Sequence, residues 1–260
     1  MVILIAESKT MLSAESDVGI EEYDAHKSLY EETAAEIMGS LEAETVADLA
    51  TMLKLSGSLA AKMKKMTDEF GFKHSGYPAI EAFTGVVFKA LDFATLPDAA
   101  KDRCREQVRI ISSLYGWLRP SDIIKPYRLD FTSRLEGGPS AGKALNAFWR
   151  MDATKALVRK LQEDSATEIL DLLPGDASKC IDWKLVKRFA KVWKADFQEM
   201  REGGAMKTPT AERLKSLRGT LLRQILTEAV PDIETLRRVS SPSYFCEGTP
   251  VYPDRLRFLC

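Results

Sequence analysis

The residues that follow Met1 form an uninterrupted apolar run, Val2-Ile3-Leu4-Ile5-Ala6, and polar residues come directly after it. A strand with one face in water alternates apolar and polar side chains, whereas a strand buried on both faces carries apolar side chains throughout. The run is too short to span a membrane, and no basic stretch precedes it as in a secretion signal. We therefore predict a buried strand at residues 2–6, in a cytoplasmic protein with no membrane contact.

Apolar residues recur at helical spacing in several later segments. The second of these helices starts behind a Thr45-x-x-Asp48 capping pattern. The predicted helices cover residues 29–37, 46–53, 59–66, 95–113, 141–161 and 211–229. Residues 108–111 fit either the last turn of the fourth helix or a short strand, because periodicity does not distinguish the two in so short a run. Further strands are predicted at residues 168–173, 189–197, 244–246 and 257–259.

The strands are few, and they are scattered among more numerous helices without regular alternation. This order favours an α+β fold, with a mixed sheet surrounded by many helices, over a doubly wound α/β sheet. The 260 residues, 45% of them hydrophobic and 29% charged, exclude a disordered or fibrous chain. Because no linker, low-complexity segment or internal repeat divides the chain, we predict one compact domain over residues 1–260.

The net charge of −1 conceals an uneven distribution of charged residues. Residues 1–50 hold two basic and twelve acidic residues, a net charge of −10, and the rest of the chain carries +9. A polyanionic partner would therefore have to bind a local basic patch rather than the protein as a whole. Two such patches are present, one at residues 54–65 and one at residues 179–194. For each of them, an ordinary solvent-exposed charged face is the alternative to a binding site.

The first basic patch lies within a predicted helix, turn and helix at residues 45–66. Leu55-Ser56-Gly57 fits the first half of a helix-hairpin-helix motif, in which backbone amides meet a DNA phosphate. The usual second glycine is replaced by Leu59, so that lysines would supply much of the attraction for phosphate. The candidate DNA-binding residues here are Lys54, Ser56, Gly57, Lys62, Lys64 and Lys65. An ordinary helical hairpin that packs on the core is the alternative.

A second candidate site lies at residues 114–129, where two prolines and a glycine constrain the chain. Arg119 and Arg128 are suited to clamp a phosphate or carboxylate, and aromatic side chains nearby could stack on a base. These aromatic residues are Tyr115, Trp117 and Tyr127. Alternatively, the arginines pair with Asp122 and Asp130 to hold a rigid loop while the aromatic rings lie in the core.

Lys9 and Thr10 follow the predicted first strand closely, and the carboxyl ends of parallel strands commonly border a binding crevice. Lys9 is suited to neutralise a phosphate or, with a neutral amine, to form a Schiff base, which makes it the one candidate catalytic residue. The segment is not a P-loop, because Ala6-Glu7-Ser8 stands where a glycine-rich cradle would be. An ordinary surface lysine is the alternative.

The cysteines and histidines indicate neither a metal site nor a cofactor. Four cysteines without a Cys-x-x-Cys pair, and only two histidines, form no recognisable ligand spacing. We predict free thiols, no bound metal and no cofactor, and no catalytic triad is apparent.

Several segments, taken together, resemble those of the YaaA family, the bacterial peroxide-stress proteins. The similar segments are Ile5 to Met11, Phe83 to Phe88, Leu114 to Pro120 and Pro126 to Leu129, extended by Phe148-Trp149, Arg218-Gly219 and Ser243-Tyr244-Phe245. The resemblance covers nearly the whole chain. It implies an α+β fold particular to the family, a DNA-binding helix-hairpin-helix beside a positive cleft, and a role under peroxide stress in limiting damage by unincorporated iron.

Motif residues of the family are carried over only where this sequence matches them. The matching positions are Lys9, Thr10, Tyr115, Gly116, Arg119, Pro120, Tyr127, Arg128, Lys215 and Arg218. The chain departs from the family pattern in the hairpin, around residues 170–179 and around the late basic motif.

Two functions are compatible with these observations. The first is a DNA-binding stress protein that holds DNA largely independently of sequence through the hairpin lysines and a basic cleft with Arg119, Arg128 and Lys215. The second is an enzyme acting on a nucleoside, nucleotide or damaged DNA base, with Lys9 and the loop from Tyr115 to Arg128 forming its site. The sequence decides neither between them nor on the oligomeric state.

Overall fold

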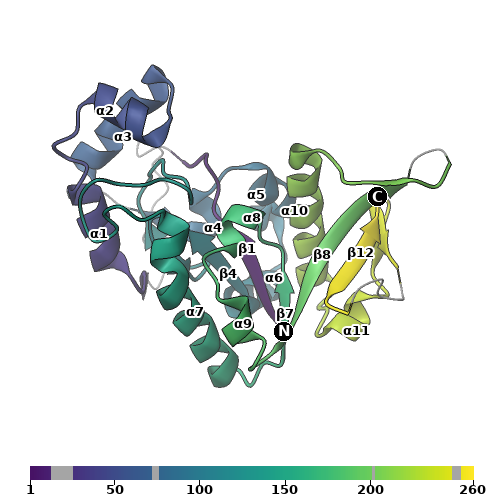
Figure 1. Ribbon diagram of the computed structural model, residues 1–260. Helices are drawn as coiled ribbons and strands as arrows, with labels where there is room; N and C mark the ends of the chain where they lie inside the picture. The colour runs from purple at the N-terminus through teal and green to yellow at the C-terminus, as the bar shows by residue number, and fades with distance from the viewer. Residues whose placement is uncertain (13–25, 72–75, 201–202, 248–252) are drawn as a thin grey trace.

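The computed structural model describes residues 1–12, 26–71, 76–200, 203–247 and 253–260, and a mixed sheet runs through its centre (Figure 1). Within the described residues this sheet has nine strands in the order β10-β11-β12-β8-β7-β1-β4-β5, with β9 paired to β8. The strands are β1 (Val2–Ala6), β4 (Val108–Ser112), β5 (Gly116–Leu118), β7 (Glu168–Asp171), β8 (Lys191–Met200), β9 (Met206–Lys207), β10 (Ser240–Ser241), β11 (Tyr244–Cys246) and β12 (Arg255–Leu259). A smaller sheet joins β2 (His26–Lys27), β6 (Asp122–Ile124) and β3 (Tyr77–Pro78).

Helices cover both faces of the large sheet. In Figure 1, α7 and α9 lie in front of the sheet and α5 and α6 lie behind it, where α10 packs against both. The helices are α1 (Glu31–Gly39), α2 (Val46–Leu53), α3 (Gly57–Glu69), α4 (Ala79–Ala82), α5 (Val86–Leu91), α6 (Asp98–Gln107), α7 (Leu145–Glu163), α8 (Gly175–Ser178), α9 (Trp183–Val186), α10 (Ala211–Thr227) and α11 (Ile233–Leu236), with a 3-10 turn at Phe93–Thr95. None of the helices in the described ranges is both long enough and apolar enough to cross a membrane.

The centre of the sheet is parallel. β4, β1, β7, β8 and β12 are neighbours in that order, and each adjacent pair runs in the same direction. Numbered along the chain, these five strands have the spatial order 2-1-3-4-5, which places the reversal of strand order at β1, between β4 and β7. This is a doubly wound arrangement with antiparallel strands added at its edges.

The predicted mixed sheet surrounded by helices is confirmed, but the α+β class is corrected to a mixed α/β class. The sequence did not predict the alternation of strands and helices, because α8 and α9, which connect β7 to β8, have four residues each. Helices this short contain too few residues for an apolar periodicity to appear.

Burial explains why β1 and β4 form. Residues 2–5 are at most 1% exposed, as a strand between two parallel neighbours requires. The ambiguous residues 108–111 belong to strand β4, which is buried along its whole length, and α6 ends before them at Gln107. Their β-branched side chains pack well in a sheet.

The turn after β4 is held in place by α7. Gly116 has a φ of +67°, and a β-carbon at this position would lie 2.5 Å from the buried ring of Trp149. The indole N–H of Trp149 donates a hydrogen bond to the Ser113 carbonyl over 2.8 Å. These contacts determine where Ser112 and Ser113 lie at the carboxyl end of β4.

Candidate functional site

The first candidate site lies where β1 and β4 end side by side. Glu7 follows β1, and its backbone N–H donates to the Ile111 carbonyl of β4 over 2.9 Å. In open parallel sheets, ligands bind outside the carboxyl ends of the strands at the point where strand order reverses. Glu7 occupies that point, because β1 separates β4 from β7.

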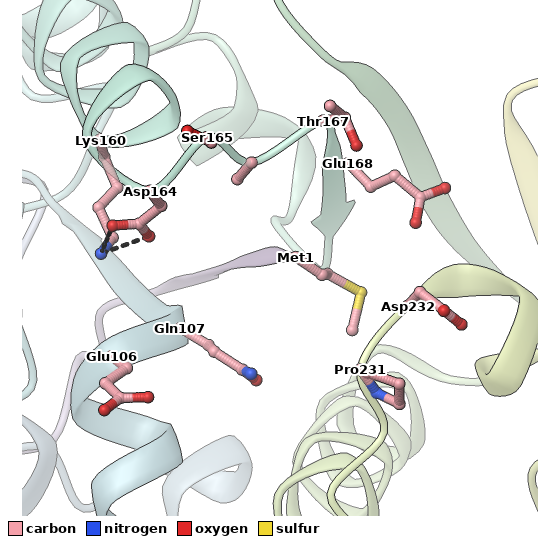
Figure 2. Close-up of a pocket in the computed structure, with 11 residues that line it drawn as sticks. Met1, Glu106, Gln107, Lys160, Asp164, Ser165, Thr167, Glu168, Pro231 and Asp232 are labelled. Carbon is pink, nitrogen blue, oxygen red and sulfur yellow. Dashed lines mark hydrogen bonds and ion pairs between the residues drawn. The ribbon is translucent and has the colours of Figure 1, made fainter.

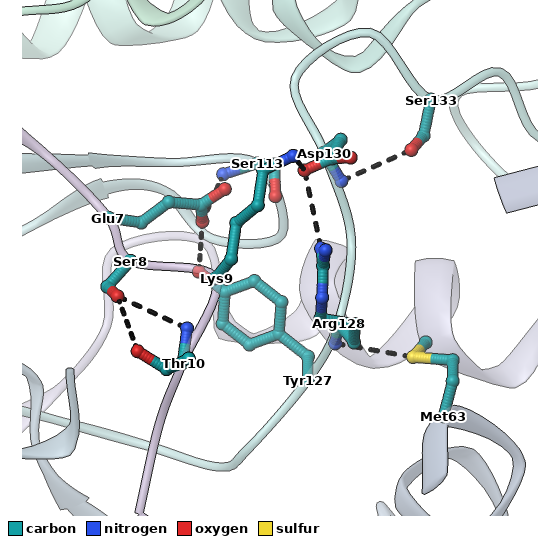
Figure 3. A network of polar contacts seen from close by, with 10 residues as sticks. All are labelled: Glu7, Ser8, Lys9, Thr10, Met63, Ser113, Tyr127, Arg128, Asp130 and Ser133. Atoms are coloured by element: carbon teal, nitrogen blue, oxygen red, sulfur yellow. Dashed lines mark hydrogen bonds and ion pairs between the residues drawn. The ribbon is translucent and has the colours of Figure 1, made fainter. Parts of the chain in front are cut away.

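Glu7 takes part in a hydrogen-bond network with residues more than one hundred positions away (Figure 3). The Ser113 backbone N–H donates to Glu7 Oε2 over 2.8 Å, and the Tyr127 hydroxyl donates to the same oxygen. The Ser112 hydroxyl lies 2.7 Å from the Tyr127 hydroxyl and accepts a further hydrogen bond from the Tyr115 backbone N–H over 2.9 Å. Burial of the polar tyrosine is thereby compensated, and Glu7 is held in a defined position.

The protonation of Glu7 is unusual for a carboxyl group. Burial raises the pKa of Glu7 to about 7, although the hydrogen bonds from Ser113 and Tyr127 act in the opposite direction. Burial, and secondly the negative charge of Glu7, raise the pKa values of Tyr127 and Cys180. Glu7 as a whole residue is partly exposed, at the edge where β1 ends. A carboxyl group with these properties exchanges protons near neutral pH.

Lys9 and Arg128 converge on one carboxylate beside this network (Figure 3). Asp130 Oδ1 lies 2.7 Å from Lys9 Nζ and 3.3 Å from an Arg128 guanidinium nitrogen. The Lys9 side chain is 62% exposed, whereas that of Arg128 is 15% exposed. The structure therefore brings two of the predicted cations together, and Asp130 now bridges them.

Thr10 lies on the same segment as Lys9 and is held by local contacts. The Ser8 hydroxyl accepts a hydrogen bond from the Thr10 backbone N–H over 3.2 Å and lies 3.2 Å from the Thr10 hydroxyl. A β-carbon at Gly85 would lie 2.0 Å from the Ser8 hydroxyl, so glycine allows α5 to approach this segment. The path of the chain after β1 is thus constrained from two sides.

Arg119 takes a different place from Arg128. Its side chain forms an ion pair of 2.8 Å with Asp122, whose carboxylate is nearly inaccessible to solvent, and it also donates to the Lys27 carbonyl. The Arg119 backbone N–H donates to the second oxygen of Asp122. The residue therefore fastens the turn before β6 to the small sheet, as the loop-holding alternative predicts.

The aromatic residues of the second candidate segment belong to the core. Tyr115, Trp117 and Tyr127 are 2%, 5% and 3% exposed, and the rings of Tyr115 and Tyr127 meet edge to face at 5.8 Å. The Tyr115 hydroxyl accepts a hydrogen bond from the Lys125 backbone N–H. Their burial agrees with the alternative in which these rings lie in the core and the loop is held by ion pairs.

The predicted helix, turn and helix at residues 45–66 is present as α2, a short connection and α3. Lys54 adopts a left-handed conformation that ends α2, and α3 begins at Gly57, two residues before the predicted start at residue 59. Ser56 and Gly57 are exposed, as are Lys54 and Lys62. Lys64 pairs with Asp68 and donates to the Glu42 carbonyl, and Lys65 lies 4.0 Å from Glu69.

One contact joins this hairpin to the strand-edge site. Met63 lies on the buried face of α3, and its sulfur accepts a hydrogen bond from the Arg128 backbone N–H over 3.3 Å (Figure 3). The segment that carries Tyr127 and Arg128 therefore lies between the hairpin and the end of β1. Two sets of residues that the sequence treats as separate candidates are neighbours.

The late basic residues lie on α10. Lys215 is exposed, whereas Arg218 is partly buried and interacts electrostatically with Asp171 at the carboxyl end of β7. Burial lowers the pKa of Arg218 and raises the pKa of Asp171. Asp171 is the last residue of β7, so Arg218 lies near the carboxyl end of the strand next to β1.

Sequence reasoning missed Glu7, Ser113 and Asp171 as site residues. The available signal was position, because each of these polar residues ends or directly follows an apolar strand. Their significance arises from burial and from contacts with distant residues, which the sequence does not display.

A separate pocket of about 510 Å³ lies at the opposite, amino edge of the sheet (Figure 2). Its lining includes Glu106, Asp164, Glu168 and Asp232, with Lys160 paired to Asp164. This acidic lining repels phosphate groups, and the pocket lies away from the strand ends that border ligand sites in parallel sheets.

Within the part of the chain that the structure describes, the cysteines and histidines form no further cluster. Cys104 and Cys180 are buried free thiols, and burial raises the pKa of Cys104 to about 12 and that of Cys246 to about 11. Such thiols react slowly with peroxide, because the thiolate is the nucleophilic form. Across the described ranges no three His, Cys, Asp or Glu residues are grouped to hold a metal ion, and His74 lies outside these ranges.

Comparison with known proteins places the chain among relatives of similar length. The family model described as peroxide stress protein YaaA matches residues 1–248. A UPF0246 protein of Shewanella pealeana is 30% identical over 250 residues, covering 94% of this chain and 93% of the relative. The UPF0246 protein Bpet1601 of Bordetella petrii is 29% identical over 99% of this chain and 98% of its own length, and a UPF0246 protein of Legionella pneumophila is 27% identical over 100% and 99%. The chain therefore belongs to the peroxide stress protein YaaA family.

Proposed function

We propose that this protein binds DNA through the phosphate backbone and, as a member of a peroxide-stress family, limits iron-linked oxidative damage there. The observation that carries the proposal is the hydrogen bond from the Arg128 backbone to Met63 of α3. This contact supports the proposal because Met63 is the neighbour of Lys62 on α3, and Arg128 shares the Asp130 carboxylate with Lys9. Separate basic segments thus become one candidate surface for a polyanion.

Each part of this surface has a distinct contribution to phosphate binding. Lys54 and Lys62 are exposed at the hairpin, and the first turn of α3 carries no acidic residue. The exposed amides at the start of α3 are therefore available to a phosphate oxygen. Lys9 and Arg128 add two cations whose partner, Asp130, a DNA phosphate would have to displace. Contacts of this type are insensitive to base sequence and sensitive to salt.

The test is a double charge reversal on α3, Lys62→Glu with Lys65→Glu, measured by fluorescence anisotropy with a labelled duplex. Lys155→Glu with Lys207→Glu is the matched control, since both lysines are exposed and lie on α7 and β9. We expect the α3 variant to lose about tenfold or more in affinity near 100 mM salt, because two phosphate contacts become repulsive. The control should bind like the wild type. Equal losses in both variants, or none in the α3 variant, would show that the hairpin does not contact DNA.

A second candidate function is an enzyme acting on a nucleotide unit, favoured by the position of Glu7 at the reversal of strand order. Lys9 fits a phosphate anchor better than an amine nucleophile, because its ammonium group is engaged by Asp130 and a nucleophilic amine has to be neutral. The two functions are compatible, since a DNA-binding surface can deliver a nucleotide to a neighbouring site.

A further inference from the structure

We propose that Glu7 is the general base and acid of a site that hydrolyses the N-glycosidic bond of an oxidised nucleotide held by Lys9 and Arg128. The inference deepens the second candidate function and relies on the first only for delivery of the nucleotide within DNA. It rests on the free oxygen of Glu7, on the charges around that oxygen and on the position of the residue in the sheet.

The orientation of the Glu7 carboxyl group leaves one oxygen for a ligand. The Ser113 N–H and the Tyr127 hydroxyl both donate to Oε2, and no other group in the described part of the chain donates to Oε1. The carboxyl group is therefore immobilised through Oε2, which leaves Oε1 without a hydrogen bond in a residue that is partly exposed as a whole. A general base needs this combination of fixed geometry and an accessible lone pair.

A second unpartnered group lies beside the carboxyl group. The Ser113 hydroxyl is completely buried close to the Glu7 carboxyl group, whose pKa it lowers, and among the described residues no group meets it in hydrogen-bonding geometry. Buried polar groups are normally satisfied, so an unpaired hydroxyl at such a point is suited to a water molecule or a ligand atom. The carboxyl edge of the sheet thus holds two polar groups close together in space, the Glu7 carboxyl group and the Ser113 hydroxyl.

The charges near Glu7 suit cleavage at a sugar carbon better than attack on phosphorus. Hydrolysis of a bond at an anomeric carbon passes through an oxocarbenium-like state, whose positive charge a carboxylate stabilises. Attack on phosphorus instead requires cations directed at the reacting oxygens. Here Asp130 engages Lys9 and Arg128, whereas the groups bonded to Glu7 are a hydroxyl and an amide. The cations therefore hold the phosphate, and Glu7 faces the sugar.

The reaction that follows is balanced as a hydrolysis. Glu7 Oε1 accepts a proton from water, the water oxygen forms a bond to the anomeric carbon, and the bond from that carbon to the base nitrogen breaks. Its electron pair stays on the base nitrogen, which then receives the proton from Glu7. The products are the free base and a sugar with a hydroxyl at the anomeric carbon, and Glu7 returns to its ionised form.

The experiment compares wild type, Glu7→Gln and Glu163→Gln on a duplex that carries one 8-oxoguanine or one thymine glycol. Glutamine keeps an oxygen that accepts from Ser113 and Tyr127 but does not take up a proton. Glu163 lies exposed at the end of α7 and is the matched control. Free base is quantified by mass spectrometry, and affinity for the same duplex is measured in parallel.

We expect base release by wild type and Glu163→Gln, a loss of about 100-fold or more in Glu7→Gln, and equal DNA affinity in all three. The wild-type rate should increase from about pH 6 to about pH 8, as Glu7 ionises. A thermal unfolding curve of Glu7→Gln establishes that the variant is folded.

Three outcomes count against the inference or separate it from the proposed function. If wild type binds the duplexes but releases neither base, glycosidic hydrolysis is overturned while DNA binding stands. If folded Glu7→Gln releases base like wild type, Glu7 is not the proton-transfer group. If wild type does not bind DNA, the proposed function fails, and free 8-oxo-deoxyguanosine monophosphate becomes the probe. Release of 8-oxoguanine from this nucleotide supports the inference, and an intact nucleotide after incubation overturns the inference.

Discussion

At the scale of single residues, burial decides the behaviour of the charged side chains more than their identity does. Glu7 and Asp122 are both carboxyl groups removed from water, yet Asp122 has the Arg119 guanidinium at 2.8 Å and Glu7 has only hydrogen bonds. Desolvation disfavours the charged form, and an adjacent cation favours it. Burial raises the pKa of both carboxyl groups, to about 7 for Glu7, and at Asp122 the Arg119 guanidinium opposes this shift and forms a structural ion pair.

The raised pKa of Glu7 makes stability depend on pH in a predictable direction. Because the folded-state pKa is about 7 against 4.5 for the free group, protonation of Glu7 favours the folded state. The contribution is complete below about pH 4.5 and is lost as the pH rises to about 7, amounting to about 3 kcal/mol at about 1.4 kcal/mol per pKa unit. Glu7→Gln removes this dependence.

The measurement is urea unfolding of wild type and Glu7→Gln at about pH 4.5 and about pH 8. Relative to wild type, the variant should gain up to about 3 kcal/mol in unfolding free energy between the two pH values. A difference between the two proteins that is the same at both pH values would contradict the buried carboxyl group.

At the scale of elements, the close approach of α5 and α10 depends on one glycine. A β-carbon at Gly219 would lie 2.2 Å from the Val87 carbonyl oxygen, whereas one at Gly57 would meet no atom within 4 Å. Helix α10 carries Arg218 to the edge of the sheet, so that this packing contact also positions a basic residue. The sequence shows the glycine but not what lies against it.

Gly219→Ala should therefore lower the unfolding free energy by about 2 kcal/mol, because the backbone of α5 has to move. Gly57→Ala is the control at an open helix position and should be neutral or slightly stabilising. Thermal unfolding of the two variants against wild type measures the effect. A neutral Gly219→Ala would mean that α5 and α10 separate without cost.

At the scale of the whole molecule, charge is distributed between the two edges of the sheet. The pocket at the amino edge is predominantly acidic, while Lys9 and Arg128 lie at the carboxyl edge, beside the lysine-bearing hairpin. A polyanion is therefore repelled by the acidic pocket and attracted by the cations at the carboxyl edge. The acidic first fifty residues thus do not prevent phosphate binding elsewhere.

A substitution at Asp130 tests whether the cations at the carboxyl edge attract DNA. Asp130→Asn removes the carboxylate that competes with phosphate for Lys9 and Arg128, and DNA affinity should rise by about threefold to tenfold. The slope of log affinity against log salt concentration should become steeper. Asp164→Asn, which frees Lys160 at the opposite edge, is the control and should leave affinity unchanged.

If Asp130→Asn weakens DNA binding instead, Asp130 positions the two cations for the phosphate and does not compete with it. Isotherms at about 50 mM and about 200 mM salt distinguish these two roles.

The amino-acid sequence by itself determined the buried first strand, most of the helices, the family and the candidate cations Lys9 and Arg128. These depend on local propensity, on apolar periodicity and on motifs, which involve neighbours within a few positions along the chain. The sequence also posed the correct alternatives for Arg119 and Arg128, namely pairing with Asp122 and with Asp130 or binding a ligand.

Only the tertiary structure decided the parallel strand order, the burial of Tyr115 and Tyr127 and the environment of Glu7. The Glu7 carboxyl group meets Ser113 and Tyr127, which lie 106 and 120 positions further along the chain. Desolvation and ion pairing are governed by distance in space, and this distance is unrelated to separation in sequence. A glutamate after an apolar strand therefore looks ordinary until the fold removes water from it.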